Sequence, residues 1–222
     1  METVMLDMTE AIDSVLMKRA GSILRQGGLV AFPTETVYGL GANALDEHAA
    51  ARIYAAKGRP SDNPLIVHIA KTEDLETIAA EIPENARKLA KAFWPGPLTM
   101  IFRKKAIVPY GTTGGLDTVA VRMPDHPVAL ALIEAGGGFI AAPSANTSGR
   151  PSPTRAAHVA DDLAGAVEMI IDGGNVGIGL ESTIVDLTEG EPVILRPGYI
   201  NETMLEQVIG AVHMDPALLM DD

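Results

Sequence analysis

Six basic residues lie in or beside loops that are rich in small polar residues: Lys57, Arg59, Arg122, Arg150, Arg155 and Arg196. The whole chain is acidic, with a formal net charge of −12 at pH 7. Such a protein repels polyanions at long range, so a phosphate or carboxylate must be held by a local cluster of cations. Loops at the carboxyl ends of strands converge in open α/β sheets and bind ligands there. The six positions therefore predict one anion-binding concavity that suits a small phosphate ligand better than a duplex.

Two of these loops carry groups that a polar ligand needs. The loop from Pro33 to Gly41 supplies two threonine hydroxyls, free backbone amides and glycines that permit close backbone approach; the alternative is an ordinary turn with capping threonines. In the loop from Lys57 to Pro64, Lys57 and Arg59 either complement the negative end of the preceding helix or form a ligand clamp with Asn63. Both readings stay open for each loop.

Three further positions follow or interrupt apolar runs. His68 interrupts an apolar strand, as either a satisfied core residue or a functional one. Arg122 ends another strand, and a buried guanidinium needs a carboxylate or phosphate partner, for which an internal acid is one candidate. The segment 141–154 runs from a buried strand through hydroxyl and amide side chains into a helix N-terminus, where anions bind readily. A last pair of segments, 181–183 and 195–198, begins one strand and ends another.

Several classes of protein are excluded by what the sequence lacks. It contains no P-loop, no complete dinucleotide-binding glycine motif, no H-E-x-x-H and no G-x-S-x-G. Zero cysteines exclude disulfides, zinc ribbons and thiol catalysis, and agree with a reducing compartment. The acidic N-terminus does not resemble a secretory signal, and no uncharged apolar stretch approaches the ~18 residues of a membrane span. We therefore expect a cytoplasmic protein. The remaining histidines are scattered singly, which favours structural or solvent roles: His48, His126, His158 and His213.

Periodicity predicts an α/β (α+β) fold in which a twisted mixed sheet is flanked by helices. Helices are expected over 9–25, 47–57, 72–93 with a break at Pro83, 128–135, from a cap at Thr154 to 163, and 201–209. Strands are expected over 29–32, 65–69, 98–103, 118–123, 139–142, 168–172, 183–187 and 193–195. Several strands follow one another without a helix between them, so a purely parallel sheet does not fit. We expect one domain over 1–210, and a tail or the start of a linker over 211–222.

The ordered motifs resemble the YrdC/Sua5 family, the L-threonylcarbamoyladenylate synthases, over nearly all of residues 10–210. The strings that carry the resemblance are P-T-E-T-V-Y-G-L-G at 33–41, K-G-R-P at 57–60 with N-P at 63–64, V-H-I at 67–69, W-P-G-P-L-T at 94–99, V-R-M-P at 121–124, A-P-S-A-N at 142–146, E-S-T-I-V-D at 181–186 and L-R-P-G at 195–198.

This resemblance implies a YrdC-like fold with a concave ligand cavity and a cytosolic nucleotidyltransferase. Such an enzyme converts L-threonine, bicarbonate and ATP to threonylcarbamoyl-AMP, pyrophosphate and water, the first step of N6-threonylcarbamoyladenosine formation in tRNA. It implies a threonine pocket of Thr36, His68, Arg122, Ala142 and Ser182, with Thr34 beside them. It also implies ATP contacts from Lys57, Arg59, Asn63, Thr118, Ser144, Asn146, Ser152 and Arg196, of which Lys57 and Arg59 are the catalytic candidates.

The implied chemistry needs no covalent nucleophile, because a carbamate attacks the α-phosphate as pyrophosphate leaves and positioning with electrostatic stabilisation carries catalysis. In this hypothesis Arg122 holds the threonine carboxylate. Mg²⁺ is expected with ATP, although no metal ligands can be assigned. The resemblance also implies a downstream tRNA threonylcarbamoyltransferase as partner, with no stable nucleic-acid complex and no membrane. A non-catalytic RNA-binding module that uses the same cationic concavity is the alternative, against which the net charge of −12 speaks. Two-domain relatives continue beyond a linker, and this sequence stops at Asp222.

Overall fold

A single mixed sheet organises the molecule. The computed structural model describes residues 1–58, 60 and 63–219, and within them eleven strands pair in the order β1-β8-β2-β3-β7-β4-β6-β5-β9-β10-β11. Their bounds are β1 Val4–Asp7, β2 Val30–Pro33, β3 Tyr38–Asn43, β4 Ile66–His68, β5 Leu98–Arg103, β6 Thr118–Arg122, β7 Ile140–Ala141, β8 Met169–Asp172, β9 Thr183–Asp186, β10 Val193–Arg196 and β11 His213–Met214. The sheet contains both parallel and antiparallel pairs: β4 pairs parallel with β6, and β6 pairs antiparallel with β5. The predicted α/β fold with a mixed sheet is confirmed.

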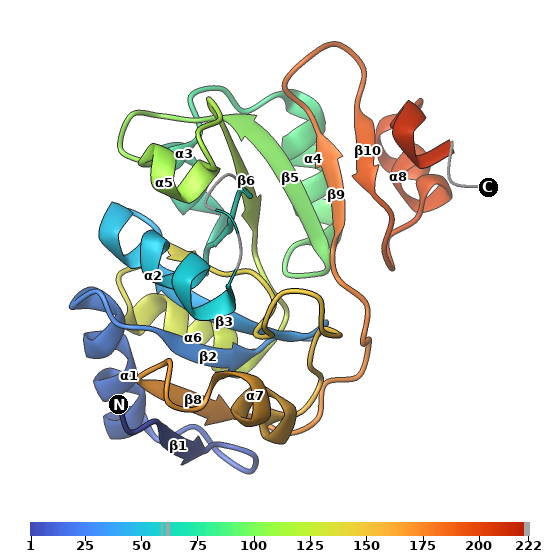
Figure 1. Ribbon diagram of the computed structural model, residues 1–222. Coiled ribbons are helices and arrows are strands. Elements are labelled where there is room, and N and C mark those ends of the chain that lie inside the picture. The colour runs from blue at the N-terminus through green and yellow to red at the C-terminus, as the bar shows by residue number, and fades with distance from the viewer. Residues whose placement is uncertain (59, 61–62, 220–222) are drawn as a thin grey trace.

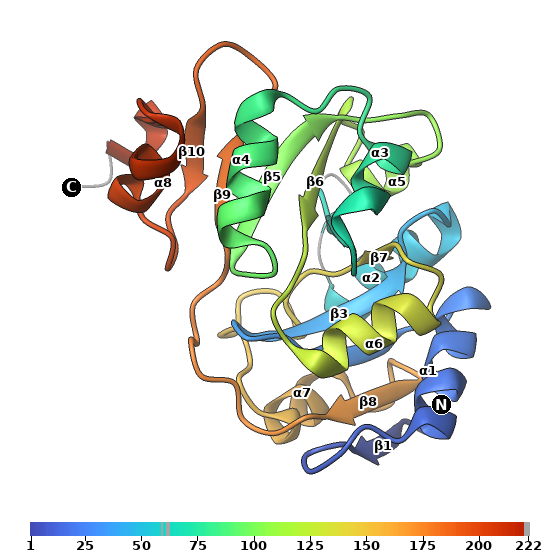
Figure 2. The same ribbon diagram turned by 180° about the vertical axis from the view of Figure 1, so that it is seen from behind.

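Helices cover both faces of this sheet. They are α1 Ser14–Arg25, α2 Glu47–Lys57, α3 Leu75–Ile78, α4 Glu84–Phe93, α5 Tyr110–Thr113, α6 Pro127–Ala135, α7 Ala156–Leu163 and α8 Glu202–Ile209, with 3₁₀ turns at Thr72–Asp74 and Pro216–Leu219. In Figures 1 and 2, β1, β8, β2 and β3 form one half of the sheet with α1, α6 and α7, while β6, β5, β9 and β10 form the other with α4 and α8. None of the described helices has the length and apolar character needed to cross a membrane.

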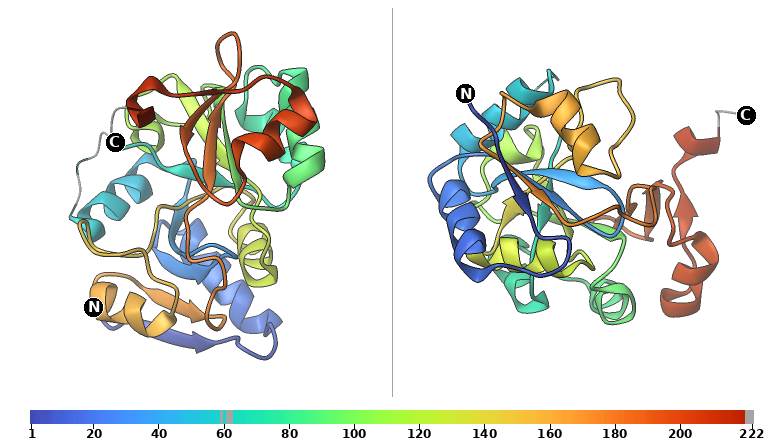
Figure 3. Two further views of the ribbon diagram at one scale, coloured as in Figure 1. Left: turned by 90° about the vertical axis from the view of Figure 1, so that its right-hand side faces the viewer. Right: turned by 90° about the horizontal axis from the view of Figure 1, so that it is seen from below.

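Alternation along β2 builds two separate cores. Because successive side chains of a strand point to opposite faces, Val30 and Phe32 pack with α1 and α6, whereas Leu29 and Ala31 pack into the larger cluster on the other face. The view from below in Figure 3 shows α1 and α6 on one side of these strands, and α2 and α7 on the other. Burial on both faces explains why these strands read as continuous apolar runs.

Capping residues set the ends of α2 and the start of α8 close to where the sequence predicts them, whereas the predicted start of the first helix at residue 9 is wrong, because Asp13 caps α1 and the helix begins at Ser14. The Asp46 side chain accepts hydrogen bonds from the backbone of the first turn of α2, and Gly58 ends that helix in the left-handed conformation with φ 65°. Asn201 caps α8 in the same way as Asp46 caps α2. The predicted cap at Thr154 is wrong: α7 begins one residue later, after Arg155, without a side-chain cap, and the Thr154 carbonyl instead accepts from Val176 N at 3.0 Å.

The segment predicted as one loop over 33–41 contains a strand. β3 pairs antiparallel with β2 from Tyr38 onward. Its glycines serve close packing here, since a Cβ at Gly41 would lie 3.0 Å from the Val30 carbonyl and the Phe32 ring, and one at Gly39 would lie 3.4 Å from the Ala142 Cβ. The glycines that suggested a loop are therefore explained by close packing around a strand.

Short strands at both ends of the chain are absent from the predictions. β1 pairs parallel with β8 at one edge of the sheet. β11 pairs parallel with β10 at the other edge, inside the segment expected as a tail or linker, and Val212 just before it is buried. A two-residue strand has too little pattern to be recognised in a sequence. The domain limit at 210 stays a prediction.

Candidate functional site

A small cavity lies where the ends of β4, β6, β9 and β10 meet the loops that follow β2 and β7. Its volume is about 180 Å³. It is lined by Thr34, Thr36, Val37, Gly39, Pro64, Ile66, His68, Arg122, Ala142, Pro143, Ser144, Glu181, Ser182 and Arg196. All six residues that the family resemblance assigned to threonine are in this lining, together with two of those assigned to ATP, Ser144 and Arg196. The structure thus brings together residues up to 162 positions apart, from Thr34 to Arg196.

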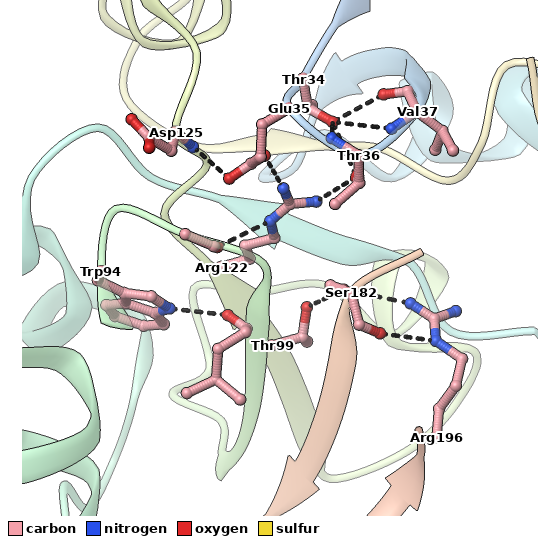
Figure 4. A network of polar contacts seen from close by, with 12 residues as sticks. Thr34, Glu35, Thr36, Val37, Trp94, Thr99, Arg122, Asp125, Ser182 and Arg196 are labelled. Atoms are coloured by element: carbon pink, nitrogen blue, oxygen red, sulfur yellow. Dashed lines mark hydrogen bonds and ion pairs between the residues drawn. The ribbon is translucent and has the colours of Figure 1, made fainter. Parts of the chain in front are cut away.

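Arg122 ends β6 at the floor of this cavity and is only 4% exposed. Its Nε donates to the Gly96 carbonyl at 3.2 Å and its Nη1 to Thr36 Oγ1 at 3.1 Å, while Nη2 is paired with Glu35 Oε1 (Figure 4). Glu35 Oε2 in turn accepts from Asp125 N at 2.7 Å. The internal acid that the sequence left open is therefore Glu35. Because a guanidinium has five N–H groups, two of them have no partner among the described residues.

Burial and the neighbouring charges all shift the pKa of this arginine, but not in one direction. Burial lowers the pKa of Arg122, while the neighbouring Glu35 carboxylate raises it and the Arg196 guanidinium lowers it further. Arginine titrates far above neutral pH, so Arg122 stays charged. A buried charge that is paired and hydrogen-bonded on three sides is held in one orientation, ready for a second anion.

The two threonines of the first loop lie with their hydroxyls in contact. Thr34 Oγ1 donates its proton to the Val37 carbonyl at 2.7 Å and accepts from the backbone N–H groups of Thr36 and Val37 at 3.2 and 3.3 Å. Thr36 Oγ1 lies 3.0 Å from Thr34 Oγ1, whose two lone pairs are already used by these amides. Because Thr36 Oγ1 accepts from Arg122, it keeps one lone pair that can face the cavity. The Thr34 hydroxyl, in contrast, is used within its own loop.

His68 ends β4 beside Arg122 and is 4% exposed. Its Nδ1 lies 3.0 Å from the Ile66 carbonyl, which can only accept, so the proton is on Nδ1 and Nε2 carries a lone pair. Burial, with the positive charge of Arg122 as the next cause, lowers the pKa of His68 to about 3. The ring also packs edge-on against Phe32, with centroids 6.1 Å apart. At neutral pH this histidine is an uncharged hydrogen-bond acceptor.

A second arginine and a second acid form the outer part of the cavity. Arg196 Nη1 pairs with Glu181 Oε2 at 2.7 Å, its Nε donates to the Ser182 carbonyl at 2.9 Å and its Nη2 to Ser182 Oγ at 3.2 Å. Ser152 Oγ donates to the other oxygen of Glu181 at 2.9 Å. Partial burial lowers the pKa of Arg196, and Glu181 opposes this shift. Glu181 thus joins Arg196 to Ser152, two residues expected at ATP.

Lys57 ends α2 and is buried, with 3% exposure. Its Nζ donates to the Ser144 carbonyl and, at 3.4 Å, to Asn146 Oδ1. Asn146 Nδ2 donates to the carbonyls of Thr147 and Arg150 at 2.9 and 2.8 Å. The lysine therefore fixes the loop after β7 against the end of α2, directly behind the cavity wall formed by Ser144.

Other predicted residues lie away from the cavity lining. Thr118 begins β6, four residues before Arg122 and therefore roughly 13 Å along the strand. Asn63 is exposed, and its carbonyl accepts from the Tyr54 hydroxyl. Arg59 lies outside the described residues. The expectation that six cations share one concavity is wrong for Arg150, whose side chain is 64% exposed and pairs with Asp162 at 3.3 Å. Arg155 precedes α7 and is not among the lining residues either.

The sequence analysis assigned no role to three side chains that contact the predicted site residues, although each stands in a quoted motif. Glu35 and Glu181 directly adjoin residues assigned to threonine, and the signal that could have found them is charge balance: a buried arginine requires an acid nearby. Thr99 ends the W-P-G-P-L-T string and lies 2.7 Å from Ser182 through the two hydroxyl oxygens. No local pattern marks that contact, because the two residues are 83 positions apart.

Comparison with known proteins places this geometry in a family. The model of the Sua5_yciO_yrdC family, described as telomere recombination, matches residues 22–198. A threonylcarbamoyl-AMP synthase of Pyrococcus abyssi is 59% identical over 216 residues, which are 97% of this chain and 64% of that protein. One of Bacillus subtilis is 57% identical over 202 residues, 90% of this chain and 58% of that protein. The chain thus spans less than two thirds of the length of these relatives.

A solved structure agrees with the sequence matches. The crystal structure of P. abyssi Sua5 complexed with L-threonine superposes with a TM-score of 0.96 at 58% identity, covering 99% of this chain and 65% of that one. The backbone that positions the cavity is therefore shared over nearly the whole described chain.

Proposed function

The chain belongs to the Sua5/YciO/YrdC family, and from that membership we propose that it is the catalytic part of a threonylcarbamoyl-AMP synthase. The reaction joins L-threonine, bicarbonate and ATP to give threonylcarbamoyl-AMP, pyrophosphate and water. The observation that carries the proposal is the cavity of about 180 Å³, in whose lining all six residues assigned to threonine meet around the buried Arg122. The threonine complex of the P. abyssi relative supports the same assignment.

The polarity of the cavity suits threonine. The two N–H groups of Arg122 without a described partner can hold the threonine carboxylate as a bidentate pair. His68 Nε2 and the free lone pair of Thr36 Oγ1 accept hydrogen bonds, so they suit the amino and hydroxyl groups. Ala142 and Val37 offer apolar surface for the methyl group. Ser182 completes the set of six proposed threonine residues, and Thr34 acts through Thr36.

ATP belongs at the outer part of the cavity, where its α-phosphate can reach the carbamate. Arg196, Ser144 and Ser152 surround that part, and Lys57 with Asn146 holds the loop behind it. We assign ATP contacts to these five residues, and we keep Arg59, Asn63 and Thr118 as proposed contacts on the strength of the motifs alone.

The proposed chemistry proceeds in two steps. Bicarbonate takes up a proton and loses water to give carbon dioxide, the uncharged threonine amine adds to its carbon, and the nitrogen releases one proton, so that one carbamate and one water are formed. A carbamate oxygen then attacks the α-phosphorus in line, the bond to the β-phosphate oxygen breaks, and pyrophosphate leaves with the bonding pair. Negative charge grows on the phosphate oxygens, and cations fixed before the reaction stabilise it at little reorganisation cost. Lys57, Arg59 and Arg196 are the proposed cations.

Mg²⁺ is proposed to accompany ATP. The described residues contain no group of three or more histidines, aspartates or glutamates placed to hold a metal ion. Magnesium prefers oxygen ligands and commonly binds substrate phosphates with few protein carboxylates, so we assign its ligands to the nucleotide. When bound, it would offset charge on the triphosphate.

The wider setting follows from the proposed product. Threonylcarbamoyl-AMP is an activated mixed anhydride, so a tRNA threonylcarbamoyltransferase must consume it, and the absence of cysteine agrees with a reducing cytoplasm. The RNA-binding alternative is less well supported, because both cavity arginines are already paired with glutamates and Arg122 is buried.

The deciding experiment is pyrophosphate release from ATP by the purified chain with Mg²⁺. We expect release only when L-threonine and bicarbonate are both present, and an Arg122→Ala variant that needs far more threonine. A chain that releases no pyrophosphate with all substrates present would refute the proposal. An Arg122→Ala variant with unchanged threonine saturation would refute the role of Arg122 alone.

A further inference from the structure

Thr99 lies directly under the cavity without being part of its lining. It is fully buried on β5, opposite Arg122 of the antiparallel neighbour β6, and β9 pairs with the other edge of β5. Residues opposite each other in a ladder point to the same face, so Thr99 lies on the face that carries Arg122. Its Oγ1 is 2.7 Å from Ser182 Oγ, as Figure 4 shows between the two arginines.

Counting protons fixes the direction of this hydrogen bond. Ser182 Oγ already accepts from Arg196 Nη2. If Ser182 also donated to Thr99, the Thr99 proton would be buried without any acceptor among the described residues, which is unfavourable. If Thr99 donates instead, both lone pairs of Ser182 are used and its own proton is free. Thr99 is therefore the donor.

We propose that Thr99 is a positioning residue that makes the Ser182 hydroxyl a hydrogen-bond donor toward the ligand. This proposal rests on the proposed function and deepens it. A free Ser182 proton requires an acceptor on the ligand, such as a carboxylate or carbamate oxygen. Ser182 and Arg122 thus form a donor wall that binds the acidic end of the amino acid.

Acceptor groups lie on the other side of Arg122. His68 stands opposite Arg122 in the β4–β6 pair, and its Nε2 carries a lone pair. Thr36 Oγ1 accepts from Arg122 Nη1 and keeps a second lone pair. A ligand with acceptors at one end and donors at the other therefore fits in one direction, which Thr99 helps to set through Ser182.

The test compares L-threonine binding by calorimetry in the wild-type chain, four single variants and one double variant. Thr99→Val removes the hydroxyl at nearly constant volume, Thr99→Ser keeps it, and Ser182→Ala removes the group on which Thr99 acts. Thr112→Val is the matched control, because Thr112 is also fully buried and its hydroxyl donates to the Ala44 carbonyl at 2.6 Å, outside the cavity lining.

We expect Thr99→Val to weaken threonine binding about five- to tenfold, as expected for a lost hydrogen bond of ordinary strength. Thr99→Ser and Thr112→Val should bind within about twofold of the wild-type chain. A merely structural role would weaken binding whether or not Ser182 is present, so the decisive arm is the double variant. Adding Thr99→Val to Ser182→Ala should cause no further loss.

Each other outcome has a definite meaning. A wild-type chain that binds no threonine overturns the proposed function. If the wild-type chain binds and Thr99→Val binds equally well, or weakens binding to the same extent in the Ser182→Ala background, the positioning role is overturned while the function stands. If Thr99→Val does not fold in a thermal melt, Thr99→Cys replaces it; its weaker donor should give a smaller loss, again abolished by Ser182→Ala.

Discussion

The cavity contains two arginine–glutamate pairs of similar design, one of which is more deeply buried than the other. Arg122 with Glu35 and Arg196 with Glu181 each place a guanidinium, braced by a glutamate, against a hydroxyl of the proposed threonine pocket. The side chains of the first pair are 5% and 15% exposed, and those of the second are 33% and 36% exposed. Charge pairs become stronger and less sensitive to salt as water is removed. The inner half of the cavity, around Arg122 and Glu35, should therefore behave differently from the outer half, around Arg196 and Glu181, despite their similar design.

This difference matches the two proposed substrates. A small amino acid must be held in one orientation, which a buried and fully braced arginine provides. A triphosphate arrives with its own charge and counter-ions, and a partly exposed arginine can exchange its glutamate partner for phosphate at lower cost. Under the proposed function, the inner half would therefore determine which amino acid binds, and the outer half would adapt to the nucleotide.

The largest effect is expected from Arg122→Ala in the inner half. The substitution leaves the Glu35 carboxylate buried without its partner, so we expect the free energy of unfolding to fall by about 3–5 kcal/mol and threonine binding to be lost. Urea unfolding and calorimetry measure the two effects. Arg103→Ala is the control, because its pair with Glu189 is exposed, and it should change stability by less than about 1 kcal/mol. Equal losses in the two variants would contradict the assigned depth of the inner pair.

A second effect should come from pH. The pKa of His68 is lowered to about 3 in the folded chain, whereas its ordinary pKa is 6.5. Between these two pH values the unfolded chain binds a proton at His68 and the folded chain does not. The contribution of His68 to the free energy of unfolding is therefore fully present above pH 6.5 and is lost as the pH falls toward 3. Between pH 7 and pH 5 we expect His68 to account for a loss of about 2 kcal/mol.

The measurement compares urea unfolding of the wild-type chain and His68→Gln at both pH values. The wild-type chain should lose about 2 kcal/mol more than the variant. His126, whose pKa burial also lowers, titrates in both proteins and cancels in the comparison. Identical pH dependence in the two proteins would show that His68 is less shielded than its burial indicates.

The elements of the fold differ in how far the sequence reveals them. Periodicity predicts most elements, because the apolar run of β5 and the helical spacing of α2 are local signals. β3 escaped prediction because Gly41 must pack tightly against Ile140, which lies in the neighbouring strand β7 and far away in the sequence. Local pattern thus fails where neighbours that are distant in the sequence determine the residue type.

The site shows the same division. Motifs identify residues that line the cavity, such as His68 and Arg122, because their types are unusual beside apolar strands. The residues that hold them are ordinary by comparison: Glu35 and Thr99 could be surface and core residues of any protein. Their roles follow only from contacts across 87 and 83 positions, which no spacing rule contains.

The smallest effect on stability is expected from Arg196→Ala in the outer half. Because the Arg196–Glu181 pair is about one-third exposed, its loss should lower the free energy of unfolding by no more than about 1 kcal/mol. The KM for ATP should nevertheless rise about tenfold or more, since the variant lacks a proposed phosphate contact of the charge-assisted kind. Steady-state pyrophosphate release at 50 and 300 mM salt tests both points. The ATP dependence of the wild-type chain should weaken with salt, whereas that of the variant should change less, because one screened charge is missing. If threonine saturation shifted as much as ATP saturation, the outer arginine would belong to the amino-acid site, and the division of the cavity into two halves would have to be abandoned.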